Sequence, residues 1–167
     1  AGTTSHVIQG NFIGTNRDGT AKLPNVDGVS VVLYATGNQI GGTLESERNI
    51  ISGNNRFGVV VASSFSDPTL RNRVQGNYIG TDAVGEAAVP NGNTTLNGDQ
   101  AIMVMDAAVR IGTNGDGLYD AAERNVISGN GVDGVFVYTS TATGNVIQGN
   151  AIGTDISGTL DVGNRVR

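Results

Sequence analysis

The chain has 167 residues, 38% of them hydrophobic and 15% charged, with a net charge of −5, no cysteine, no tryptophan and 26 glycines. The length suits one domain with a hydrophobic core, and the abundant glycine and asparagine argue against long helices. The sequence contains no run of about 20 apolar residues, the length needed to span a bilayer. Without cysteine there are no disulfides, thiol nucleophiles or cysteine-ligated zinc, and the scattered basic residues argue against nucleic acid or an anionic membrane surface as a partner.

The chain opens with a block that recurs twice farther along. Residues 6–15 read H-V-I-Q-G-N-F-I-G-T, and closely matching blocks occupy residues 72–82 and 145–155. In each block, short runs with apolar residues at alternate positions are interrupted by a Gly-Asn pair, which is typical of short strands separated by turns. We therefore expect the same strand and turn unit at three places in the chain.

A second motif and a set of valine-rich strands lie between these blocks. The motif R-N-x-I-S-G-N fills residues 48–54 and again residues 124–130. Short β-branched strands are predicted at residues 28–32, 58–61, 100–104 and 134–137. The units recur in the same order, which indicates a long repeat of two coils, one compact and one carrying a long loop.

Recurrence of whole multi-strand blocks predicts a solenoid. Hairpins are the alternative, because Gly-Asn turns also join antiparallel strands, but hairpins do not explain why the blocks return in the same order. Stacked coils explain it, since each residue type then lies above its copy. We predict an all-β solenoid of about four to five coils, forming one domain over residues 1–167 with longer loops at residues 82–99 and 112–123.

Equivalent residues of stacked coils are expected to lie above one another. The recurring aliphatic residues should point inward and stack as a column: Ile8, Ile13, Ile40, Ile51, Val74, Ile79, Ile111, Ile127, Ile147 and Ile152. The recurring asparagines should sit at turns, where each amide can bond its counterparts above and below: Asn11, Asn54, Asn77, Asn130 and Asn150.

The blocks at residues 48–54, 72–82, 124–130 and 145–155 resemble the repeats of right-handed parallel β-helix proteins. These proteins belong to the pectate-lyase-like superfamily, and the resemblance is closest to repeat regions of large bacterial secreted and surface proteins. It implies a right-handed parallel β-helix and an extracellular or cell-surface location, with sugar polymers as frequent ligands or substrates. The printed chain contains no signal peptide, so the location is expected from the resemblance alone. No catalytic motif of the superfamily is present, and we assign no catalytic residue.

Residues 112–123 contain the most specific chemical pattern. Against the calcium loop D-x-[DN]-x-[DN]-G-x5-E, the chain supplies oxygen ligands at positions three, five, nine and twelve through Asn114, Asp116, Asp120 and Glu123. Gly112 stands where the pattern requires its first aspartate. Calcium is the one cofactor that the sequence suggests, and the alternative is an Asp-Gly turn with a solvated acidic rim.

Two aspartates occupy equal repeat positions and form the strongest candidate for paired carboxylates. Asp82 and Asp155 would lie about 10 Å apart if they are two coils apart, within the range that glycoside hydrolysis uses. Asn16 fills the same position in the first copy, which favours a turn role. His6 is the single histidine, which excludes a multi-histidine metal site, and its place near the chain start indicates an exposed edge residue and not a catalytic base.

Two classes of function fit these observations. The first is a structural or interaction module, a stalk or adhesin-like segment, whose partners are polysaccharide or another protein. The second is a polysaccharide lyase or glycoside hydrolase with a groove along one sheet face, where Asp106 and Arg110 would be the first residues to mutate and the outward Phe136 and Tyr138 could stack on sugar rings. We favour the first class because the specific motifs are architectural. The chain starts and stops inside a repeat, so we also expect end-to-end self-association or continuation into further repeats of a longer protein.

Overall fold

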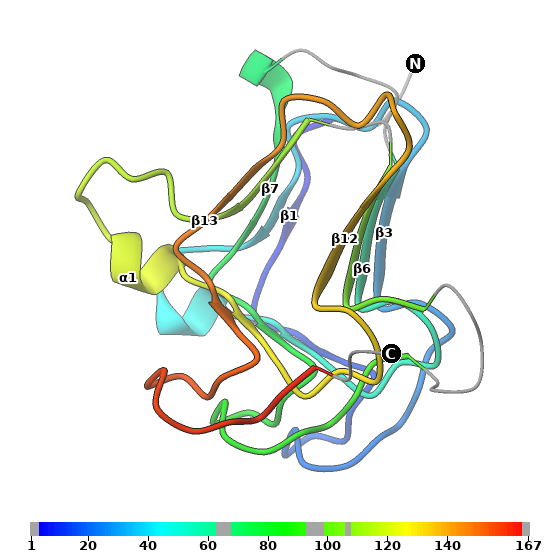
Figure 1. Cartoon of the computed structure of the whole chain (residues 1–167), viewed down its shortest axis with the longest axis vertical. Helices are drawn as coiled ribbons and strands as arrows, with labels where there is room; N and C mark the ends of the chain where they lie inside the picture. Colours follow the sequence, from blue (N-terminus) through cyan, green and yellow to red (C-terminus); the bar gives the residue numbers. More distant parts are fainter. Residues whose placement is uncertain (1–3, 63–67, 93–98, 106–107, 165–167) are drawn as a thin grey trace.

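The computed structural model describes residues 4–62, 68–92, 99–105 and 108–164, and over these ranges the backbone winds as a parallel β-helix (Figure 1). Three parallel sheets run along the axis, and each coil gives at most one strand to a sheet. The strands are only two to four residues long. The prediction of an all-β parallel solenoid is confirmed.

The sheets are built from strands that are far apart in the sequence. The first sheet contains β1 (Val7–Ile8), β4 (Gln39–Gly41), β7 (Asn72–Gln75), β10 (Val109–Gly112) and β13 (Val146–Gln148). The second contains β2 (Phe12–Ile13), β5 (Ile50–Ile51), β8 (Tyr78–Ile79), β11 (Val126–Ile127) and β14 (Ala151–Ile152). The third contains β3 (Val29–Val32), β6 (Val59–Ala62), β9 (Ile102–Met105) and β12 (Val135–Tyr138).

In the part of the chain that the structure describes, short helical turns interrupt the coils at three places: η1 (Glu45–Glu47), η2 (Pro68–Leu70) and α1 (Asp120–Glu123). No helix in the described ranges is long and apolar enough to cross a membrane.

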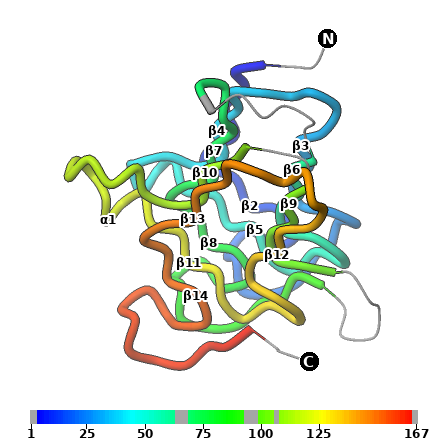
Figure 2. Tube along the Cα trace, turned by 45° about the horizontal axis from the view of Figure 1, so that its top comes forward, coloured from blue at the N-terminus to red at the C-terminus, as the bar shows by residue number. Residues whose placement is uncertain are grey.

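Consecutive coils stack in register. Coil 1 holds β1 to β3, coil 2 holds β4 to β6, coil 3 holds β7 to β9, coil 4 holds β10 to β12, and coil 5 holds β13 and β14. Every strand pairs in parallel with its counterpart in the adjacent coil. Figure 2 shows the members of each sheet following one another along the axis. The predicted number of four to five coils therefore holds.

The aliphatic core forms two columns in the first two sheets, where we expected one. Ile40 pairs in register with Ile8 and Val74, whereas Ile51 pairs with Ile13 and Ile79. The middle members are fully buried, and alternate residues of the third sheet, such as Val59 and Ile102, close the core from the other side. In coil 5, Ile147 and Ile152 remain 42% and 47% exposed, because no described coil covers their far side.

The five predicted asparagines fall into two separate rows, so they do not all bond one another. The corner ladder runs through the turn between the first and second sheets and consists of Asn11, Asn49, Asn77, Asn125 and Asn150. The loop ladder lies after the second sheet and consists of Asn25, Asn54, Asn91, Asn130 and Asn164. In both ladders each Nδ2 donates to the Oδ1 of the next asparagine at 2.9–3.1 Å. We expected one row because the same Gly-Asn pair occurs in both ladders.

The two-coil repeat comes from insertions that alternate between two corners of the coil. The first corner joins the first two strands of a coil, and the second corner follows the second strand. In coils 1, 3 and 5 the first two strands are joined by a tight Gln-Gly-Asn turn, and the insertion follows the second strand. In coils 2 and 4 the insertion lies between the first two strands and contains η1 or α1, and the connection to the third strand is short. Neither kind of coil is the compact one that we predicted, because each carries an insertion. Figure 1 shows η1 and α1 projecting on one side and the insertions of coils 1, 3 and 5 gathered along the lower edge.

Candidate functional site

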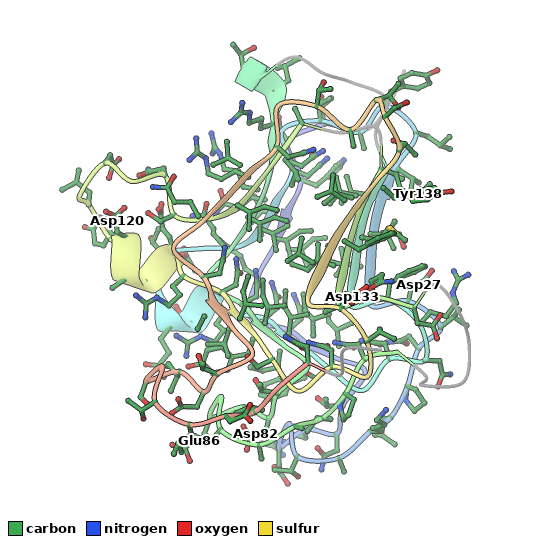
Figure 3. All side chains as sticks on the ribbon, viewed as in Figure 1. Asp27, Asp82, Glu86, Asp120, Asp133 and Tyr138 are labelled. Atoms are coloured by element: carbon green, nitrogen blue, oxygen red, sulfur yellow. The ribbon has the colours of Figure 1, made fainter. Side chains whose placement is uncertain are left out.

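The predicted calcium loop connects β10 to α1 and projects from the first corner of coil 4. Figure 3 shows Asp120 on this projection, away from the core. Gly112 ends β10 with a φ of 94°, and a side chain there would clash with the Asn150 side chain of the corner ladder. The ladder therefore requires glycine at the position where the calcium pattern asks for aspartate.

The four predicted ligands bond the loop that carries them. The Asp116 carboxylate accepts from Asn114 Nδ2 at 2.9 Å and from the Leu118 amide at 2.7 Å. The Asp120 carboxylate accepts from the Thr113 hydroxyl and from the Gly117 amide. Among the described residues, no group of three or more histidine, cysteine, aspartate or glutamate side chains is arranged to hold a metal ion. Calcium binding stays a prediction, and the contacts present are those of a self-capped turn.

Glu123 has a role that the calcium pattern does not account for. It is 5% exposed, and its Oε2 accepts from the Asn114 amide at 2.8 Å. In coil 2, Glu47 holds its own insertion in the same way, accepting from the Thr43 and Leu44 amides at 2.8 and 3.0 Å. The shared sequence Glu-Arg-Asn at residues 47–49 and 123–125 carried this signal, and our sequence analysis missed it.

The arginine of this motif ties its coil to the next one. Arg48 Nε donates to the Gly76 carbonyl at 3.3 Å, and its guanidinium lies 4.2 Å from the centre of the Tyr78 ring. Burial raises the pKa of the Tyr78 hydroxyl, and the charge of Arg48 opposes that rise. Arg124 repeats the backbone contact with Gly149 at 3.1 Å. Both arginines thus act between coils.

The two aspartates considered as a catalytic pair hold turns. Asp82 Oδ1 accepts from the Glu86 and Ala87 amides at 3.0 and 3.3 Å, and Asp82 and Glu86 lie in one loop in Figure 3. Asp155 Oδ1 accepts from the Thr159 and Leu160 amides at 3.0 Å each.

The pKa of Asp155 falls to about 2, chiefly through its bond from the Ser157 hydroxyl and then through the backbone donors. Asn16 makes the same two amide contacts in coil 1, through Oδ1, at 2.9 and 3.1 Å. An uncharged acceptor therefore suffices at this position.

The remaining residues singled out in the sequence are spread over the coil. His6 is exposed and its backbone amide donates to Asn38 Oδ1 at 3.0 Å. Arg110 lies on β10 and donates Nη1 to the Thr113 carbonyl at 3.2 Å, whereas Asp106 lies outside the described residues. Phe136 and Tyr138 stack on β12 with ring centroids 5.8 Å apart.

A groove of about 590 Å³ runs along the second corner, beside the loop that begins at residue 82. Residues of all five coils line it, among them Lys22, Asn55, Pro90, Gly131 and Asn164. Burial lowers the pKa of Lys22. The polysaccharide-active alternative predicts a groove along one sheet face, formed by the longer loops at residues 82–99 and 112–123, but no residue of 112–123 lines this one. The groove offers one amine and many small or amide side chains.

Comparison with protein-family models, curated proteins and solved structures finds no match to this chain.

Proposed function

We propose that the chain is a structural and interaction module of a bacterial secreted or cell-surface protein. One observation carries the proposal: the recurring polar side chains of the blocks are used to hold the coil. The asparagines bond one another and the main chain, the glutamates and aspartates bind loop amides, and the arginines reach the next coil. Residues that recur for architectural reasons favour a scaffold over a catalyst.

The repeat resemblance supports membership of the pectate-lyase-like superfamily, and with it an extracellular or cell-surface location. The inward side chains of the end coils are incompletely covered: Ile147 and Ile152 in coil 5 are exposed, and Ile8 and Ile13 in coil 1 are only partly buried. This supports stacking against further coils of the same kind. Those coils would belong to the same protein or to another copy.

The second candidate is a polysaccharide-active domain, and the groove of about 590 Å³ is the observation that favours it. An extended sugar chain would lie along the coil corners, with Lys22 and the asparagine amides as polar contacts.

A turnover and binding screen separates the two proposals. The purified chain is incubated with uronate and neutral polysaccharides with and without calcium, and reducing ends and unsaturated products are measured beside binding to the same polymers. A structural and interaction module gives no product, with or without binding. Turnover that is lost in Lys22→Ala, but kept in the loop variant Arg17→Ala, would replace it with the enzyme proposal.

A further inference from the structure

Two arginines lie side by side on the first sheet, and a third directly precedes one of its strands. Arg73 on β7 pairs in register with Arg110 on β10, so their backbones lie about 4.8 Å apart. Arg71 directly precedes β7 and is two residues from Arg73 in the chain. Its Nη2 lies 4.0 Å from the position of a Cβ added at Gly144, so its side chain reaches towards coil 5. We call these residues the arginine patch.

No acid among the described residues forms an ion pair with this patch. Within the described ranges the ion pairs are Arg48 with Glu45 and Arg56 with Asp27, and no member of the patch takes part in one. Arg71 Nε is buried without a hydrogen-bond partner. The contact of Arg110 with the Thr113 carbonyl uses one of its five N–H groups.

Stability does not explain this arrangement. Like charges directly opposite each other on neighbouring strands destabilise a sheet, and an unsatisfied buried donor does so too. The chain has a net charge of −5, yet three of its cations lie together with no described acid bonded to them. Other arginines do have evident structural contacts, as with Arg48, Arg56 and Arg124.

The spacing of the patch selects a kind of anion. A guanidinium is a planar fork that binds a carboxylate through two parallel hydrogen bonds, so one fork already occupies both carboxylate oxygens. A phosphate or sulfate ester presents three acceptor oxygens that neighbouring forks can share. We propose that Arg71, Arg73 and Arg110 form a binding site for a tetrahedral oxyanion ester, the sulfate or phosphate group of an anionic polymer.

The neighbouring residues limit the size of this site. In the register of the first sheet, the positions of Arg73 and Arg110 are occupied by Val7 in coil 1, Gln39 in coil 2 and Val146 in coil 5. The positive charge is therefore confined to the middle of the sheet and suits one or two ester groups. A long duplex, with its dense phosphates, needs many more cations than this patch supplies.

Titration calorimetry of the full chain at about 0.15 M salt tests the site, with dextran sulfate, polyphosphate and polygalacturonate as probes. We expect saturable binding of dextran sulfate or polyphosphate, and the tighter of the two identifies the ester. Inorganic phosphate in millimolar excess should compete with it. Polygalacturonate carries only carboxylates and should bind more weakly. Lack of saturable binding by both esters, lack of competition, or equally tight polygalacturonate binding would overturn the proposal.

Matched variants separate the patch from general charge attraction. Arg73→Gln should weaken binding about tenfold, and Arg73→Lys, which keeps the charge but loses the fork, should weaken it nearly as much. Arg17→Gln removes the same charge from an exposed loop residue and should leave the affinity within about twofold. Circular dichroism checks that each variant is folded. Equal losses in Arg17→Gln and Arg73→Gln would refute the site, whatever the turnover screen shows.

Discussion

Replacing Asn77 with alanine tests whether the corner ladder holds the coils together. Asn77 is fully buried; its Oδ1 accepts from the Asn49 amide and side chain, and its Nδ2 donates to the Ile40 carbonyl at 2.9 Å. Alanine leaves the Asn49 amide without its ladder acceptor and removes the side-chain donor to the Ile40 carbonyl. Each buried group left unsatisfied costs about 1–3 kcal/mol, so Asn77→Ala should lower the free energy of unfolding by about 3–4 kcal/mol.

Urea unfolding followed by circular dichroism measures this loss, and Asn11→Ala is the matched control. Asn11 belongs to the same ladder but is exposed, so water replaces the bonds that its side chain loses, and the cost should stay below about 1 kcal/mol. Asn77→Asp adds a second test, because it keeps the acceptor, loses the donor and buries a charge. It should be less stable than Asn77→Ala at neutral pH and recover as the pH falls. Equal costs for Asn77→Ala and Asn11→Ala would refute the ladder as a source of stability.

Three further predictions concern the core, the turns and the metal. Ile79→Ala should lower the free energy of unfolding by about 3–4 kcal/mol, because the side chain is fully buried. Ile152→Ala, at a half-exposed position, should lower it by about 1 kcal/mol. Urea unfolding measures both values, and similar losses would contradict the packing argument. Because the folded pKa of Asp155 is about 2, its stabilisation is complete above about pH 4 and is lost as the pH falls towards 2. Asp155→Asn should therefore flatten the stability profile in that window, and an unchanged profile would count against it. If residues 112–123 bind calcium, the ion at about 100 times its Kd should stabilise the chain by about 2.7 kcal/mol and raise its melting temperature. Asp116→Asn should reduce that rise. An unchanged melting temperature at millimolar calcium would refute calcium binding.

The fold could be predicted from the sequence because the coils of a solenoid use the same residue types at equivalent positions. The third-sheet strands were located from valine-rich runs, and Gly28, Gly58 and Gly134 directly precede three of them. The alignment of coils was less accessible. Phe12 pairs with Ile50, which equates a Gly-Asn turn with an Arg-Asn pair that follows an insertion. Gly-Asn pairs look the same in the sequence wherever they occur. Strand pairing separates the pairs between the first two strands of a coil from those that follow the second strand.

The functional residues were harder to predict for a related physical reason. Asp116 and Glu123 matched a ligand pattern, but a short loop needs acceptors for its own amides, and both carboxylates serve that purpose here. The arginine patch gave no signal in the sequence, because Arg73 and Arg110 are separated by a long loop and become neighbours only through the register of β7 and β10. Residues that recur were therefore predictable, and residues brought together once were not.

The alternation of insertions follows from the thickness of the loops. Each second-corner loop closes on itself through an antiparallel bridge, Thr15 with Lys22 and Thr81 with Ala88. The loops of coils 3 and 5 touch, since the Ile156 amide donates to the Gly85 carbonyl at 3.2 Å, and two coils advance by only about 10 Å. No space remains for a loop on the coil between them, so coils 2 and 4 must place their insertions at the other corner. The fold should therefore accept a duplicated pair of coils, whereas duplication of a single coil would force two like loops into the space of one.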